Sequence, residues 1–150
     1  MLRAENTVTV DRPIGDVFAY LADGTNNPRW RSGVLAIQRT SSDDGAGATY
    51  RQKLRGPGGR PIDGDYRITA YQPPTLIEFQ VTAGPARPGP ARPTGRFTLT
   101  DAGPGRTTVT FALDLTPTGL MRLMSGMVAR TMRSEVDQLA QLKADLEKTT

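Results

Sequence analysis

The chain has 150 residues, a formal net charge of +4 and a pI near 9.8, and this length suits one domain with its own hydrophobic core. It contains no cysteine and no histidine, which excludes disulfides, thiolate metal sites and the usual hydrolase triads. The basic residues, mostly arginine, are spread along the chain without a dense run, so we expect no nucleic-acid binding. The N-terminus lacks the apolar segment of a signal peptide, and no apolar run approaches the ~20 residues of a membrane span. These features predict a cytoplasmic protein.

The N-terminal residues predict a strand followed by a helix. Residues 5–10 alternate between polar and apolar side chains, as a short strand does. Residues 13–24 carry apolar side chains at helical spacing, with Pro13 suited to the first turn and Gly24 to the end of the helix. Residues 25–31 are short and polar, and they predict a turn or a second short helix.

A strand meander is predicted for residues 33–116, where the apolar period becomes two and glycine or proline clusters divide the stretch. Six strands fit there, which gives seven with the N-terminal strand. Glycine-rich stretches at residues 45–47 and 56–59 lack the strand and helix context of a nucleotide-binding loop. They are predicted to be hairpin connections, and we expect no cofactor and no metal.

Two hairpins allow the register of the sheet to be predicted, because a slip of one residue would send every apolar side chain to the wrong face. Loops at residues 56–60 and 102–106 give consistent pairing on both faces. The predicted inner pairs are Tyr50–Tyr66, Leu54–Ile62, Phe97–Phe111 and Leu99–Val109. The predicted outer pairs are Lys53–Asp63, Arg51–Asp65, Thr98–Thr110 and Thr100–Thr108.

The remaining segments are a proline-rich connection and a long helix. Residues 84–95 contain four prolines, which prevents regular pairing, so this loop is either a mobile linker or a lid over a pocket. Residues 116–150 carry a continuous apolar stripe and predict a helix of about 30 residues, roughly 45 Å long. Gly126 is its candidate bend.

This order of elements is that of the helix-grip fold, and several local segments resemble the START-like, SRPBCC superfamily, in particular its bacterial polyketide cyclase/dehydrase and lipid-transport branch. The resemblance covers essentially all of residues 1–150. The segments that carry it are VTVDRPIGDVFAYL at residues 8–21, Asp23 followed by Trp30, YQPPTLIEF at 71–79, GRTTVT at 105–110 and LKADLE at 142–147. It implies an α+β domain in which a seven-stranded curved antiparallel sheet surrounds the C-terminal helix, with one or two short helices after the first strand.

The resemblance also implies a cavity between the sheet and the first half of the long helix. Met121, Met124, Met127 and Met132 fall in that half; methionines of this kind line apolar pockets or simply fill core space. Aromatic and polar residues of the inner face either orient a ligand or serve as packing. The candidate ligand-binding residues are Trp30, Tyr50, Gln52, Tyr66, Phe79, Phe97, Phe111, Leu120, Met121, Met124, Met127 and Val128.

Glu135 is the most informative residue, because it falls within the apolar stripe of the long helix. A carboxylate there is either paired with an arginine or backbone groups, or is held for acid/base chemistry or ligand binding. Glu135, Tyr50 and Tyr66 are therefore the candidate catalytic residues.

Three functions remain open from the sequence. The leading hypothesis is non-covalent binding or transport of a small hydrophobic molecule, a lipid or polyketide-like compound. The second is a polyketide cyclase or dehydratase that uses tyrosine, glutamate and arginine for acid/base work. The third is a protein-interaction module whose basic outer surface binds an acidic partner. The fold alone does not choose among them.

Overall fold

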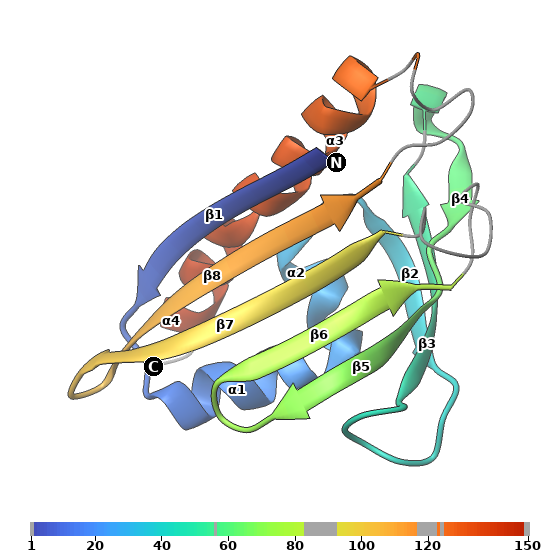
Figure 1. The fold of residues 1–150 in the computed structure, drawn as a ribbon. Coiled ribbons are helices and arrows are strands. Elements are labelled where there is room, and N and C mark those ends of the chain that lie inside the picture. Colours follow the sequence, from blue (N-terminus) through green and yellow to red (C-terminus); the bar gives the residue numbers. More distant parts are fainter. Residues whose placement is uncertain (1, 56, 83–92, 117–122, 124, 149–150) are drawn as a thin grey trace.

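The structure of the protein, a computed structural model, describes residues 2–55, 57–82, 93–116, 123 and 125–148. It consists of one curved antiparallel sheet with the helices grouped on one side of it (Figure 1). The strands are β1 (Leu2–Val10), β2 (Val34–Arg39), β3 (Thr49–Arg55), β4 (Pro61–Asp63), β5 (Tyr66–Gln72), β6 (Leu76–Val81), β7 (Thr94–Gly103) and β8 (Arg106–Leu115). The helices are α1 (Ile14–Ala22), a 3₁₀ turn at Gly24–Asn26, α2 (Asn27–Trp30), a 3₁₀ turn at Pro57–Gly59, α3 (Ser125–Asp137) and α4 (Leu139–Lys148).

The strand order is β1-β8-β7-β6-β5-β3-β2, and the short β4 pairs with β3. The seven-strand path and the helix after β1 confirm the predicted α+β architecture. All four predicted inner pairs and the outer pairs Lys53–Asp63, Thr98–Thr110 and Thr100–Thr108 form as expected. None of the helices in the part of the chain that the structure describes is long and apolar enough to cross a membrane.

The predicted third strand of the meander is divided into β4 and β5 by Gly64 and Asp65. The carboxylate of Asp65 accepts a hydrogen bond from the backbone N–H of Gln52 at 2.9 Å. The predicted outer pair Arg51–Asp65 is therefore missing from the strand pairing. Gly64 lies so close to Leu54 that a Cβ atom would come within 2.5 Å of its side chain, which accounts for a glycine at the interruption.

The C-terminal helix has two parts, α3 and α4, separated at Gln138. The Gln138 amide donates to the Glu135 carbonyl, three residues back, at 3.2 Å, which tightens the chain at this point. Gly126, the candidate bend, is the second residue of α3, and a bend there stays a prediction. The start of the predicted helix, at 117–122, lies outside the described residues.

The helices are held to the sheet by an apolar core. α3 packs on β1 and β8, and α4 packs on β1 and α2. The helix residues that point into the core are Met132, Val136, Leu139, Leu142 and Leu146. Among residues 126–131, by contrast, only Val128 is partly buried, so the first half of α3 adds little to the core.

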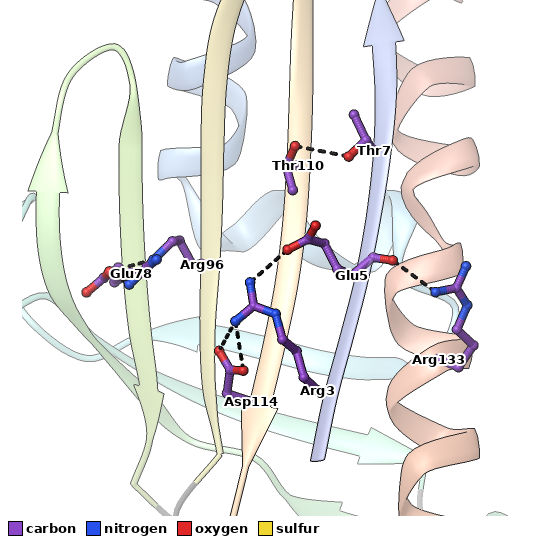
Figure 2. A network of polar contacts seen from close by, with 8 residues as sticks. All are labelled: Arg3, Glu5, Thr7, Glu78, Arg96, Thr110, Asp114 and Arg133. Atoms are coloured by element: carbon purple, nitrogen blue, oxygen red, sulfur yellow. Dashed lines mark hydrogen bonds and ion pairs between the residues drawn. The ribbon is translucent and has the colours of Figure 1, made fainter. Parts of the chain in front are cut away.

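The outer face of the sheet carries charges that pair with one another within and across strands (Figure 2). Arg3 binds Glu5 at 2.7 Å and Asp114 at 3.0 Å, and Arg96 binds Glu78 at 2.5 Å. In the same view, Arg133 of α3 donates to the Glu5 backbone carbonyl at 2.9 Å. The basic residues drawn there are consequently engaged in pairs rather than gathered into a positive patch.

Candidate functional site

A small hollow lies between the sheet and the segment that contains α1 and α2. Its volume is about 10 Å³, which is the room that one water molecule needs. It is lined by Leu21, Ala22, Asn27, Arg31, Tyr66, Ile68, Ile77, Phe79 and Phe97. Apolar side chains form most of this wall, and Asn27, Arg31 and Tyr66 supply its polar groups.

A continuous group of aromatic rings forms the sheet side of the hollow. The ring centres of Tyr66 and Phe79 are 5.3 Å apart, those of Phe79 and Phe97 are 6.0 Å apart, and those of Phe97 and Phe111 are 4.5 Å apart. Trp30 packs edge-on against both Phe97 and Phe111 at 5.9 Å. These spacings are those of favourable aromatic pairs, so the rings pack against one another as a continuous aromatic wall.

Tyrosine hydroxyls and side-chain amides form a buried polar cluster beside these rings. Nδ2 of Asn27 donates to Gln52 Oε1 and to the Tyr66 hydroxyl, both at 3.1 Å. The Tyr50 hydroxyl accepts from the Gly24 amide at 3.3 Å. A Cβ atom on Gly24 would come within 2.2 Å of the Tyr66 hydroxyl, and only glycine leaves that space open.

Burial raises the pKa of Tyr66 above its ordinary value, and the nearby Tyr50 raises it further, although the hydrogen bond from Asn27 acts in the opposite direction. The hydroxyl is therefore protonated at neutral pH. A protonated phenol donates a hydrogen bond but does not act as a base.

Glu135 is paired with an arginine, Arg31, which follows α2. Arg31 donates from Nε and Nη2 to the same carboxylate oxygen of Glu135, at 3.1 Å and 2.9 Å. The side chain of Arg31 is only 8% exposed and that of Glu135 is 23% exposed. The guanidinium also lies over the Trp30 ring, 5.9 Å from its centre. The structure thus supplies the arginine partner that the first interpretation of Glu135 requires.

The other candidate residues fall into three groups. Tyr66, Phe79 and Phe97 line the hollow, while Trp30, Tyr50, Gln52 and Phe111 are buried close to it. Met127 is 56% exposed, and Val128 packs at the edge of the core. Leu120, Met121 and Met124 lie outside the described residues, as does most of the proposed lid at 84–95. Their roles stay predictions.

Sequence reasoning missed Asn27 and Arg31, the two polar residues that α2 and its C-terminal end bring to the hollow. They stand four residues apart on either side of Trp30, so the helical turn places them on the same side of the chain. That spacing was the available signal, but it is informative only if residues 25–31 are taken as helical.

The fold is shared by many solved structures. A START superfamily protein from Mycobacterium smegmatis is 18% identical, with a TM-score of 0.76 over 100% of both chains. A protein from Thermus thermophilus is 15% identical, with a TM-score of 0.80 over 99% of both chains. The Zhui aromatase/cyclase from a Streptomyces species is 16% identical, with a TM-score of 0.70 over 91% of this chain and 89% of that one.

These identities establish a common fold and leave the chemistry open. No curated protein matches the chain. A family model described as "Polyketide cyclase / dehydrase and lipid transport" matches residues 1–147. The chain belongs to this polyketide cyclase/dehydrase and lipid-transport family.

Proposed function

We propose that this protein binds a small, largely apolar molecule between the inner face of the sheet and the helices. One observation carries the proposal: a wall of aromatic rings adjoins three convergent polar groups, on Asn27, Arg31 and Tyr66. Ligand sites characteristically combine an apolar lining with a few directional polar groups. Membership of a family that includes lipid transport supports the same conclusion.

The hollow has room for about one water molecule, so a ligand must widen it. Pockets of this kind open in a minor conformation that the ligand then stabilises. Helix α2 is a single turn of four residues, and it contributes one of the polar groups, Asn27. We therefore expect α2 and the ring of Phe79 to shift when a ligand enters.

A cyclase or dehydratase is the second candidate, and the name of the Streptomyces relative is its main support. Proton abstraction from a poly-ketone needs a free base. Glu135 is bound by Arg31, and the raised pKa of Tyr66 keeps it protonated. The described groups therefore favour binding and hydrogen-bond donation over general-base catalysis.

The test is saturable binding of apolar probes to folded protein. Native mass spectrometry of the protein as isolated would identify any ligand that accompanies it, and titration with an apolar fluorophore would give the stoichiometry. The proposal predicts one probe per chain and a higher Tm at saturation, because a ligand that binds only the native state stabilises it. Failure of every probe in a broad apolar panel to bind saturably would contradict it.

A further inference from the structure

The Arg31–Glu135 pair leaves part of the guanidinium free. Nε and Nη2 both donate to Glu135 Oε2, whereas Nη1 has no hydrogen-bond partner within the described part of the chain. Arg31 is also one of the residues that line the hollow. A guanidinium has five N–H donors in fixed directions, so this residue has donors left for a ligand oxygen.

Asn27 and Tyr66 also have hydrogen-bonding groups that are not in use. Nδ2 of Asn27 uses its two hydrogens for Gln52 and Tyr66, and Oδ1 has no partner among the described residues. The Tyr66 hydroxyl accepts from Asn27, and its own proton has no acceptor in the same part of the structure. Three residues that line the hollow therefore keep unused hydrogen-bonding groups, donors on Arg31 and Tyr66 and one acceptor on Asn27.

Although Arg31 is a cation, the hollow carries no positive charge overall. Glu135 neutralises Arg31 at 2.9 Å. Asp23 is a second carboxylate near enough to act electrostatically on Tyr66. An ionised ligand that enters this site loses several kcal/mol of hydration, and the two carboxylates oppose the attraction of the one guanidinium. A neutral carbonyl or hydroxyl oxygen needs only the free donors.

We propose that this site, if it has the binding function proposed above, selects uncharged molecules that carry a carbonyl or hydroxyl oxygen on an apolar body over ionised carboxylates such as fatty acids. Arg31 is the residue that receives the ligand oxygen, and Glu135 sets the selectivity by cancelling its charge. Removing the charge of Glu135 turns the same hollow into an anion site.

Three probes of nearly equal shape separate these possibilities: methyl naphthyl ketone, naphthoate and ethylnaphthalene, each substituted at the same ring carbon. At neutral pH the wild-type protein should bind the ketone at least about tenfold more tightly than naphthoate, with ethylnaphthalene weaker than the ketone. In Glu135→Gln, the affinity for naphthoate should rise about tenfold or more while that for the ketone changes little.

Asp137→Asn is the matched control, because it makes the same change of charge on the same helix. Asp137 forms an exposed pair with Arg133, with side chains 52% and 58% exposed, and its loss should leave all three affinities unchanged. The double variant Arg31→Leu/Glu135→Gln removes both charges and all donors of Arg31, and it should lose most of the ketone's advantage over ethylnaphthalene, with the Tyr66 hydroxyl as the remaining donor.

The outcomes distinguish this inference from the proposed function. If none of the three probes, and no other molecule of the broad apolar panel, binds folded wild-type protein, the binding function itself fails. If all three bind with equal affinity, the binding function stands and the selectivity is overturned. Tighter binding of naphthoate than of the ketone to the wild type would also overturn it. The wild-type comparison needs no variant, so poor folding of Glu135→Gln leaves the inference testable.

Discussion

Replacing Glu135 with glutamine tests the buried ion pair, and its cost follows from the exposure of the two partners. Exposed pairs contribute about 0–1 kcal/mol, whereas breaking a fully buried pair costs about 3–5 kcal/mol. Arg31 is 8% exposed and Glu135 is 23% exposed, which places this pair between the two cases. Glutamine keeps one oxygen that accepts a hydrogen bond from Arg31. We therefore expect Glu135→Gln to lower the free energy of unfolding by about 1–3 kcal/mol.

The assay is urea denaturation near pH 7, with the free energy of unfolding extrapolated to water. Asp137→Asn breaks the exposed Arg133–Asp137 pair on the same helix and should change stability by less than about 0.5 kcal/mol. An unchanged or increased stability of Glu135→Gln would refute the reasoning, because it would mean that the pair does not offset the burial of its charges. Equal losses in both variants would show that burial does not distinguish the two pairs.

Three further predictions concern the packing around the site. In urea denaturation, Gly24→Ala should destabilise the protein by about 1–3 kcal/mol, since the added Cβ atom would lie 2.2 Å from the Tyr66 hydroxyl. Gly15→Ala should instead stabilise it by about 0.5–1 kcal/mol, because a Cβ atom at Gly15 would have no neighbouring atom within 4 Å. A gain of stability in the first would contradict the close contact. Burial raises the pKa of Tyr66 in the folded state, so the unfolded chain loses this proton first. The free energy of unfolding is therefore retained below about pH 10 and falls as the pH rises further. Tyr66→Phe should give a shallower fall in denaturation experiments across this range, and an equal slope would assign the fall to other groups. Leu142→Ala should lower the free energy of unfolding by about 2–5 kcal/mol, since Leu142 is fully buried. Leu123→Ala should change the urea midpoint little, because the Leu123 side chain is 84% exposed. Equal effects would contradict the described core.

The sheet could be predicted well because two independent patterns agreed on its register. Inner pairs such as Tyr50–Tyr66 are apolar or aromatic, and outer pairs such as Lys53–Asp63 have opposite charges. A shift of one residue would have violated both patterns. The interruption at Gly64 was not predictable in this way, because it depends on how close the backbone comes to Leu54.

The bend of the C-terminal helix shows a limit of local propensity. Glycine is the residue that weakens a helix most after proline, which made Gly126 the natural candidate. The described helix is broken at Gln138, between Val136 and Leu139, which are both fully buried. Buried residues thus lie on either side of this break, and helix propensity alone does not report its position.

The candidate site was predicted only in part, for a similar reason. Glu135 was identifiable because a carboxylate in an apolar stripe needs a partner. The identity of that partner, Arg31, depends on where the residue that follows α2 lies relative to α3, which the sequence pattern does not encode. The aromatic wall was correctly placed on the inner face, since Phe79 and Phe97 follow the period of their strands.

Equilibrium titration of the folded wild-type protein with methyl naphthyl ketone, followed by fluorescence and calorimetry, tests the central claim most directly. The account predicts saturation at one probe per chain, a higher Tm at saturation, and displacement of the probe by any ligand that co-purifies with the protein. The claim that the interior of this domain is a ligand site would be contradicted if neither this ketone nor any of a broad panel of apolar molecules bound saturably to protein shown to be folded.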